Sequence, residues 1–229
     1  MRLSIVVPTL DEAGSIESTL VAARAAGAPG VEIVVADGGS RDATRSLAAT
    51  LADRVIEAPR GRASQMNAGA RAASGDALLF LHADTLLPPQ AHAAILEALA
   101  GGREWGRFDV SISGAGALLP MVATLMNARS RWSGIATGDQ AIFATRAAFD
   151  AVGGFPAIPL MEDVALSKAL RRRCAPACLA VRVITSGRRW ERHGTLRTVL
   201  LMWRLRLAYA LGADPHRLAR RYGAGRTSA

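Results

Sequence analysis

The chain contains little lysine, few aromatic residues, only two cysteines and no long apolar run. Lys168 is the only lysine among 28 basic residues, a bias that we attribute first to codon usage. Aromatic residues make up 5% of the chain, which argues against the base-stacking platforms of single-strand nucleic-acid binders. Cys174 and Cys178 have no second cysteine or histidine pair that would complete a zinc site, so we expect two free thiols.

No stretch reaches the roughly 20 apolar residues that a membrane-spanning helix requires. The nearest candidate, residues 111–127, is interrupted by two glycines and a proline. The opening residues are typical of a strand and too few for a secretory signal peptide. We therefore expect a cytoplasmic protein, with peripheral association at a membrane left open.

The formal charge of +9 is concentrated in the last quarter of the chain. Residues 1–170 carry a net charge of −3, whereas residues 171–229 carry +12 and contain only two acidic residues. This basic region predicts an anionic partner such as a pyrophosphate, acidic lipid headgroups or nucleic acid. A merely solvated basic face is an equally good interpretation.

Half of the 229 residues are hydrophobic, enough for one well-buried domain. Short apolar runs alternate with helical patterns, which predicts an α/β fold with a mostly parallel sheet flanked by helices. Strands are expected at residues 3–7, 32–36, 54–57, 77–81, 108–113, 140–144 and 179–185. Helices are expected at residues 16–26, 43–51, 63–73, 89–100, 162–173, 195–211 and 215–222.

Two polar loops follow the first two predicted strands, where ligands bind in such a sheet. Glu12 lies near the start of a helix, where the dipole favours a carboxylate that can also accept ribose hydroxyls. For Glu12 taken alone, simple helix capping is the better explanation of a carboxylate at this position. Asp37 precedes Gly38 and Gly39, so a ligand can approach the backbone closely, and its carboxylate can accept an N–H of a base. A tight turn is the alternative.

Two further loops follow the third and fourth predicted strands. Arg62, in a glycine-led loop, is placed to touch phosphate. Asp84 stands just beyond a buried strand, where a carboxylate can bridge Mg²⁺ or Mn²⁺ to a diphosphate. Asp also commonly begins a turn, so this single position is a weak signal.

The second half of the chain adds three stretches with candidate site residues. Asp139 precedes an apolar strand. Glu162 and Asp163 open a helix, where they either compensate the dipole or supply a base for a sugar acceptor. A basic turn then offers Arg188 and Arg189 as a clamp for a diphosphate. His193, in the same turn, offers a nitrogen ligand.

Together these stretches resemble glycosyltransferase family 2, a group with the GT-A (Rossmann-like) fold, over about residues 2–190. The resemblance is carried by S-I-V-V-P-T-L-D-E, V-A-D-G-G-S-R-D and L-F-L-H-A-D-T, then by G-G-F and E-D, in the family's order. The wording L-H-A-D-T, with G-D-Q-A-I-F and P-L-M-E-D-V-A-L, is similar to a small bacterial subgroup associated with arsenosugar biosynthesis. Residues 1–190 are thus expected to form the GT-A domain, with residues 191–229 a helical, basic C-terminal extension packed on it.

The resemblance implies roles for individual positions. The nucleoside-diphosphate sugar would be bound by Pro8, Thr9, Glu12, Asp37, Gly38, Arg62, His82, Ala83 and Asp84. Asp84 would hold the divalent metal, Mn²⁺ or Mg²⁺, with His193 as a looser match to a further ligand. Asp163, beside Glu162, would be the catalytic base. Asp139 and Gln140 would lie near the acceptor.

One departure from the family pattern affects the metal. His82 stands where the family has the first Asp of its D-x-D motif, which removes a carboxylate from the metal or ribose contact. The Q-x-x-R-W signature of processive members is also absent. We therefore expect a metal-dependent, inverting transfer of one sugar from a UDP- or GDP-type donor to an acceptor hydroxyl.

Two other functions remain as alternatives. Nucleotidyltransfer uses a related sheet, but it would require a glycine-rich basic signature directly after the first strand. A basic module could instead bind nucleic acid or a membrane surface through residues 171–229. We do not expect a nucleic-acid partner, whereas membrane contact through the basic C-terminal helix and a homodimer stay open.

Overall fold

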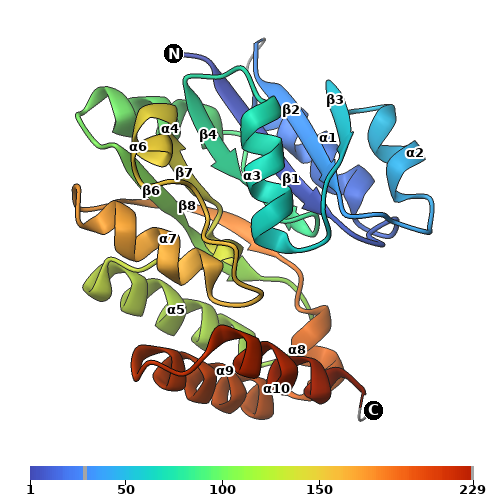
Figure 1. Ribbon diagram of the computed structural model, residues 1–229, viewed down its shortest axis with the longest axis vertical. Helices are drawn as coiled ribbons and strands as arrows, with labels where there is room; N and C mark the ends of the chain where they lie inside the picture. The colour runs from blue at the N-terminus through green and yellow to red at the C-terminus, as the bar shows by residue number, and fades with distance from the viewer. Residues whose placement is uncertain (28–29, 228–229) are drawn as a thin grey trace.

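The computed structural model describes residues 1–27 and 30–227, which form an eight-stranded mixed sheet with helices packed on it (Figure 1). The strands are β1 (Leu3–Thr9), β2 (Glu32–Asp37), β3 (Arg54–Glu57), β4 (Ala77–Phe80), β5 (Thr85–Leu86), β6 (Trp105–Ile112), β7 (Ile142–Thr145) and β8 (Ala177–Thr185). The α-helices are α1 (Ile16–Ala26), α2 (Thr44–Ala49), α3 (Arg62–Ala72), α4 (Ala91–Ala100), α5 (Leu119–Ser133), α6 (Arg146–Ala151), α7 (Glu162–Arg171), α8 (Arg188–His193), α9 (Thr195–Ala210) and α10 (Pro215–Thr227).

The sheet has the order β3-β2-β1-β4-β7-β6-β8-β5. Strands β3, β2, β1 and β4 are parallel to one another, and β6 is parallel to β8. Strand β7 joins these two parallel groups by antiparallel pairing with β4 and β6. The predicted α/β class with a mostly parallel sheet is confirmed, and the loops after β1, β2 and β4 emerge at one edge.

Two apolar layers hold the sheet between helices. Alternate residues of β1 point to opposite sides, so Ile5 joins the layer under α1, α2 and α4 while Val6 joins the layer under α3, α6 and α7. Helix α3 lies unusually close to the sheet, because a Cβ at Gly69 would approach Val6 Cγ1 to 2.3 Å. This close packing fixes the helix that carries Arg62.

The structure differs from the sequence expectation in one long helix and in several short elements. Helix α5, with 15 residues, was not predicted, because apolar residues on its exposed side, such as Met121, Leu125 and Trp132, obscure the helical period. Residues 146–151 form α6, whose start is capped by Thr145 accepting a hydrogen bond from the N–H of Ala148. Residues 188–193 form α8 rather than a turn. Residues 138–140 form a 3₁₀ turn closed by Thr137 and Gln140, so the strand starts two residues later than predicted. Helices this short show too few turns for a readable apolar period.

The basic C-terminal helices pack on the start of α7. Leu205 of α9 and Leu218 of α10 are buried with Met161 and Val164 in a separate small cluster. In the described part of the chain, none of the helices is long and apolar enough to pass through a bilayer.

Candidate active site

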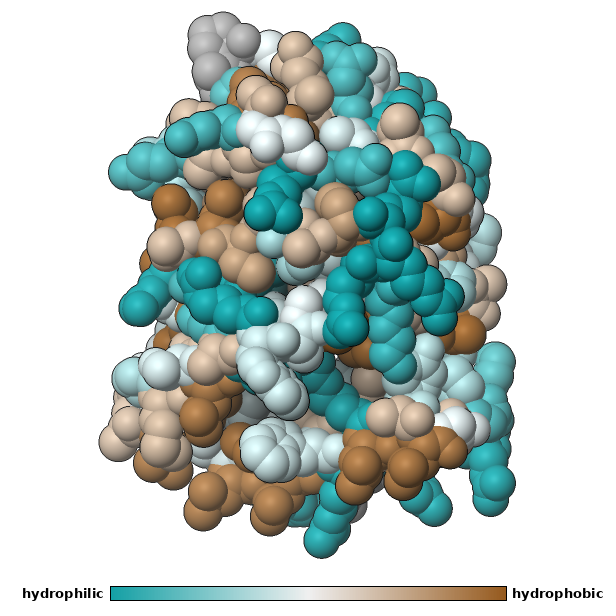
Figure 2. Space-filling view, turned by 90° about the vertical axis from the view of Figure 1, so that its left-hand side faces the viewer, coloured by the Kyte–Doolittle hydropathy of each residue, from teal (hydrophilic) through white to brown (hydrophobic). Residues whose placement is uncertain are grey.

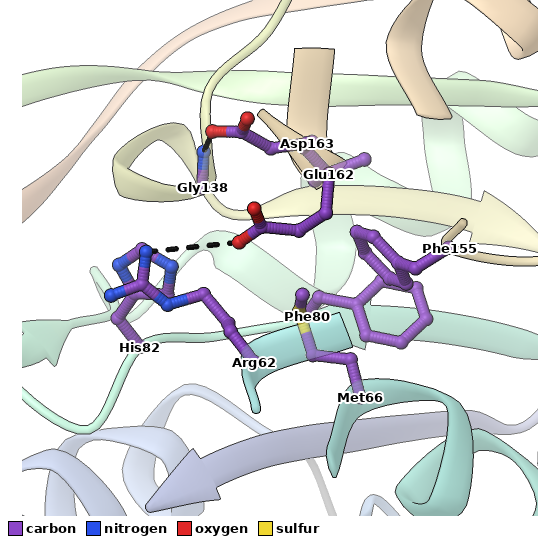
Figure 3. A pocket seen from close by; sticks show the side chains of 9 residues that line it. Arg62, Met66, Phe80, His82, Gly138, Phe155, Glu162 and Asp163 are labelled. Atoms are coloured by element: carbon purple, nitrogen blue, oxygen red, sulfur yellow. Dashed lines mark hydrogen bonds and ion pairs between the residues drawn. The ribbon is translucent and has the colours of Figure 1, made fainter. Parts of the chain in front are cut away.

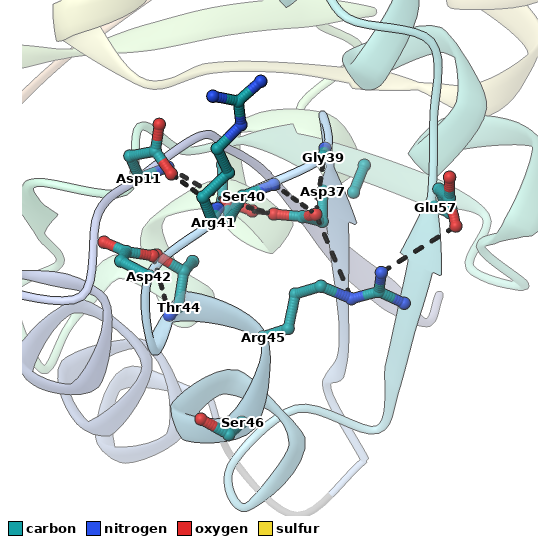
Figure 4. A network of polar contacts seen from close by, with 12 residues as sticks. Asp11, Asp37, Gly39, Ser40, Arg41, Asp42, Thr44, Arg45, Ser46 and Glu57 are labelled. Atoms are coloured by element: carbon teal, nitrogen blue, oxygen red, sulfur yellow. Dashed lines mark hydrogen bonds and ion pairs between the residues drawn. The ribbon is translucent and has the colours of Figure 1, made fainter.

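The loop after β2 wraps its own donors around Asp37 (Figure 4). The carboxylate accepts hydrogen bonds from the backbone N–H groups of Gly39 and Ser40, each at 3.0 Å, and from the hydroxyls of Ser40 and Thr9. Burial alone would raise the pKa of Asp37, but these hydrogen bonds outweigh it and lower the pKa. Asp37 is therefore a fixed, buried anion at the end of β2.

The loop after β1 is fastened to the same network. Asp11 accepts a hydrogen bond from the N–H of Arg41 at 2.8 Å and donates its own N–H to Ser40 Oγ at 2.9 Å. The N–H of Glu12 is bound by Thr44 Oγ1 at 2.8 Å. The two loops thus form one hydrogen-bonded unit. The carboxylate of Glu12 accepts a hydrogen bond from Ser15 Oγ at 2.9 Å and also reaches outside this unit.

Gln65 of α3 ties the ends of β1 and β2 together. Its Nε2 donates to the carbonyl oxygens of Thr9 at 2.6 Å and Ala36 at 2.9 Å. A Cβ at Gly38 would lie 3.0 Å from Gln65 Cδ, so the glycine makes room for this amide. Sequence reasoning missed Gln65, because a single buried glutamine on a helix carries no pattern of its own.

Arg188, at the start of α8, lies between two predicted carboxylates. Its Nη2 is 3.1 Å from Glu12 Oε2 and 3.5 Å from Asp84 Oδ2. The hydrogen bond with Glu12 raises the pKa of Arg188 above its usual range, with a further contribution from Asp84. Since all three side chains are partly exposed, this arginine can exchange carboxylate partners for a bound anion.

His82 pairs with Asp139 from the other half of the sheet. Its Nδ1 lies 3.3 Å from Asp139 Oδ1. Its Nε2 is buried and has no hydrogen-bond partner in the described residues, and a Cβ at Gly138 would approach it to 2.4 Å. The loop itself is fixed by Thr19 Oγ1, which donates to the carbonyl oxygen of Ala83 at 2.8 Å. His82 thus links the loop after β4 to the loop before β7.

A small pocket lies between these two loops and the start of α7 (Figure 3). It is lined by Arg62, Met66, Phe80, His82, Gly138, Ile142, Phe155, Glu162 and Asp163. Its enclosed volume is about 10 Å³, close to the minimum for one water molecule. A sugar therefore requires side chains at its mouth to move, and half-exposed Arg62 is the side chain most free to do so.

Glu162 and Asp163 line this pocket in different surroundings. Glu162 is 3% exposed and faces Arg62 Nη1 at 3.8 Å. Burial raises the pKa of Glu162, and the neighbouring charge of Asp163 adds to the effect. Asp163 instead accepts backbone hydrogen bonds from Gly138 at 2.8 Å and Val164 at 2.7 Å, one on each oxygen. These two contacts aim its carboxylate while leaving each oxygen a lone pair.

Arg129 of α5 and Arg206 of α9 bring positive charge toward Asp163. Burial lowers the pKa of Arg129 to about 10, repulsion by Arg206 adds to this, and the charge of Asp163 opposes it. Its Nη1 donates to the carbonyl oxygen of Ile135, whereas Nε and Nη2 are buried without a partner in the described residues. Burial also lowers the pKa of Arg206, against the charges of Asp163 and Asp139.

Positive φ angles mark the borders of the site. In the described residues, the non-glycine residues with positive φ are Asp11 at 53°, Ala141 at 47° and Met161 at 69°. Asp11 precedes Glu12, Ala141 follows Gln140, and Met161 precedes Glu162. Such conformations cost about 1–3 kcal/mol each and tend to gather at functional sites.

The structure brings some predicted site residues together and leaves others apart. Arg62, His82, Glu162 and Asp163 share the pocket, and His82 adds Asp139. Arg188 joins Glu12 to Asp84. Pro8, Thr9, Asp37 and Gly38 lie at the neighbouring strand ends, where they serve the loop network. Arg189 stacks on Tyr222 of α10 at 3.9 Å, and Gln140 is fully buried.

The residues present fit a metal only through Asp84. In the described residues no three His, Cys, Asp or Glu side chains gather as a metal site. Mg²⁺ is nevertheless often held by one or two carboxylates together with waters and substrate phosphates, an arrangement that Asp84 can serve. His193 is the last residue of α8, and within the described residues no hydrogen bond or ion pair joins it to Asp84.

The fold belongs to the GT-A class of glycosyltransferases. A mannosyltransferase from Pyrobaculum calidifontis in complex with GDP-Man and Mn²⁺ aligns with a TM-score of 0.67 at 20% identity, over 99% of this chain and 70% of that one. TarS (residues 1–349) from S. aureus in complex with UDP aligns with a TM-score of 0.64 at 19% identity, over 81% and 60%. At these identities the likeness establishes the fold alone.

Sequence comparison identifies the family. Residues 4–146 match glycosyl transferase family 2, and the chain belongs to that family. Two validoxylamine A glucosyltransferases, from Streptomyces hygroscopicus subsp. jinggangensis and subsp. limoneus, are 37% and 39% identical over 108 residues. The match covers 43% of this chain but only 26% and 24% of those relatives.

Proposed function

We propose that this chain transfers one sugar from a uridine- or guanosine-diphosphate donor to an acceptor hydroxyl, with inversion at the anomeric carbon. The observation that carries the proposal is the pocket in which Glu162 and Asp163 face Arg62 and His82 beyond the parallel strands. The family assignment supports sugar transfer. The donor nucleotides named with the structural neighbours support a nucleoside diphosphate.

The nucleoside would lie over the ends of β1 and β2. Pro8, Thr9 and Gly38 form the floor there, held in place by Gln65. Three of the four hydrogen bonds on Asp37 come from its own loop and the fourth from Thr9, so its carboxylate would accept a base N–H once the Ser40 hydroxyl rotates away. Glu12 would accept ribose hydroxyls when Arg188 leaves it.

The diphosphate would lie between Arg188, Arg189 and Arg62. Arg188 already spans Glu12 and Asp84, so phosphate oxygens would replace those carboxylates as its partners. A divalent ion on Asp84, Mn²⁺ or Mg²⁺, would neutralise charge on the departing diphosphate. His82 would act on the sugar or ribose rather than on the metal, because its Nδ1 pairs with Asp139 and its Nε2 is buried against Gly138.

The chemical step needs a base on the acceptor side, and Asp163 is suitably placed. Its carboxylate takes the proton of the acceptor hydroxyl as that oxygen bonds to the anomeric carbon. The bond from that carbon to the diphosphate breaks, and its electron pair leaves with the nucleoside diphosphate. Hydrogen bonds from Gly138 and Val164 hold the base in place. Asp139 and Gln140 would border the acceptor.

A thermal-shift panel of UDP- and GDP-sugars, with and without Mn²⁺, tests the proposal. A ligand at 100 times its dissociation constant adds about 2.7 kcal/mol of stability, or roughly 5–10 °C for a domain of this size. Asp84→Ala should remove the part of the shift that depends on Mn²⁺, whereas exposed Asp150→Ala should keep it. Absence of a shift with every donor would overturn the proposal.

The acceptor and the stereochemistry of transfer need a second experiment. The donor panel does not address them, and the resemblance to the arsenosugar subgroup does not identify the acceptor. Product analysis with the donor that gives the largest shift would establish the acceptor and show whether the anomeric configuration is inverted.

A further inference from the structure

Helix α9 carries a stripe of apolar side chains in solvent, on the side opposite its packing face. The exposed residues are Leu196, Leu200, Trp203, Leu207 and Leu211, the last directly after the helix, each between 57% and 80% exposed. Their spacing of three or four residues places them in one line along the helix. The buried residues Thr198 and Leu205 lie on the opposite side. The core of the domain therefore does not need this stripe.

Helix α5 repeats the arrangement. Met121, Leu125 and Trp132 are 52%, 55% and 91% exposed, and Leu118 just before the helix is 38% exposed. Their spacing again defines one side of the helix, whereas Asn127 and other buried residues face the protein. Two helices thus present apolar side chains that the domain leaves uncovered.

The two helices lie at the same end of the molecule, away from β2 and β3 (Figure 1). In this view α5 and α9 run side by side, and the charges of Arg129 on α5 and Arg206 on α9 are close enough to interact. Figure 2 shows hydrophobic side chains gathered at this lower end of the face in view. A gathered set of exposed apolar residues, unlike scattered ones, marks an interaction surface.

The charge around this surface is positive. Arg197 and Arg204 are exposed on α9, seven residues apart and directly beside the apolar stripe. Exposed arginines also follow on α10, at positions 217, 220 and 221. Acidic residues are almost absent, since residues 171–229 contain only Glu191 and Asp214. An occupant of this surface must therefore accept both apolar contact and positive charge.

We propose that the exposed sides of α9 and α5 dock on a bilayer with anionic headgroups, with α9 lying in the interface. An apolar stripe bordered by arginines, with a tryptophan within it, is the composition of helices that bind such an interface. Anionic lipid attracts Arg197 and Arg204, whereas a second copy of the chain would bring the same positive charges face to face. The inference does not depend on the proposed sugar transfer.

The position of α9 relates this surface to the candidate active site. Arg206, on the same helix, interacts electrostatically with Asp163 and Asp139. The docking surface is thus separated from the acceptor side of the pocket by a single helix. A bilayer-bound chain would hold that side of the pocket close to the lipid surface.

Vesicle flotation of the full chain tests the proposal. Vesicles of equal parts phosphatidylcholine and phosphatidylglycerol should bind the protein, vesicles of phosphatidylcholine alone should bind it poorly, and added salt should weaken the binding. The double variant Trp203→Ser, Leu207→Ser should bind the anionic vesicles at least about tenfold more weakly. The control is Val21→Ser, which changes a 51% exposed apolar residue on α1, away from the proposed surface, and should bind normally.

A second variant separates the apolar and the electrostatic parts. Arg197→Gln with Arg204→Gln should remove most of the preference for anionic over neutral vesicles. All these positions are exposed, and a circular-dichroism melt would confirm folding. Anionic-vesicle binding that both double variants retain would overturn the proposal. So would a concentration-dependent dimer, without lipid, that Trp203→Ser, Leu207→Ser abolishes, because a second copy would then cover the surface.

Discussion

The two halves of the candidate site treat buried charge in opposite ways. Beyond β1 and β2, the carboxylate of Asp37 is hydrogen-bonded by its own loop, and its pKa is lowered in spite of burial. Around the start of α7, burial raises the pKa of Glu162 and lowers that of Arg129. The first half is therefore stable with its charges in place. The second half holds Glu162 and Arg129 charged at a cost, although the hydrogen bond from His82 outweighs burial and lowers the pKa of Asp139 there.

This difference matches what each half would do. A surface that binds a nucleoside benefits from groups that are already oriented, because little ordering remains on binding. A site that moves a proton needs groups whose two charge states lie closer in free energy. The left-handed conformations of Ala141 and Met161 add to the cost on the acceptor side, beside Gln140 and Glu162.

The largest expected effect concerns the acceptor side. Asp163→Asn should lower turnover about 10²–10⁴-fold, the usual loss when a positioned base is removed. Donor binding should stay close to wild type, because the donor-side loops are untouched. The check is steady-state kinetics beside a thermal shift with the donor, with Asp150→Asn as an exposed control. Wild-type turnover in Asp163→Asn would move the catalytic role elsewhere.

A smaller effect is expected on the donor side, in stability. Asp37→Asn should cost about 1.5–3 kcal/mol at neutral pH, because a neutral amide replaces a carboxylate that accepts four hydrogen bonds, two of them from the backbone N–H groups of Gly39 and Ser40. Since the pKa of Asp37 is lowered by folding, its stabilisation is present above pH 3.8 and is lost as pH falls through the folded pKa. The deficit should therefore shrink in acid.

Urea denaturation at several pH values measures this deficit. Glu57→Gln is the control, because its side chain is 76% exposed and only 3.8 Å from Arg45 at the edge of the same network. It should change stability by about 0.5 kcal/mol or less. A deficit in Asp37→Asn that stays constant below pH 4 would show that the loss comes from packing rather than from charge.

The fold was predictable because long apolar patterns dominate it. The buried run at β4 and the alternation of β1 with α1 are sufficient to predict a parallel sheet. The antiparallel insertion of β7 between β4 and β6 was not predictable, since pairing partners far apart in sequence leave no local pattern. Helix α9 was expected, but no sequence pattern distinguishes its buried side from its exposed apolar stripe.

The site was predictable where a residue follows a strand end, as Asp37 and Asp84 do. The site was not predictable where a group acts from a distant helix. Arg129 and Arg206 lie near Asp163 only because the fold places α5 and α9 on the same side of the sheet as α7, and nothing in their local sequence indicates this. The missed residues therefore have one cause in common, which is tertiary packing.

The smallest expected effect is a change in stability at Glu162, and its sign distinguishes the two halves of the site most clearly. Because burial raises the folded pKa of Glu162, its contribution to stability is present below pH 4.5 and is lost as pH rises through the folded pKa. Glu162→Gln keeps the shape without the buried charge, so it should exceed wild type in stability at pH 8 by on the order of 1 kcal/mol. The gain should disappear near pH 4.

The control is Glu104→Gln. The pair with Arg173 lowers the pKa of the Glu104 carboxylate, so this variant should behave oppositely and lose stability above pH 4.5. If Glu162→Gln is instead the less stable protein at pH 8, the contact with Arg62 outweighs burial, and the two halves of the site do not differ in how they hold buried charge.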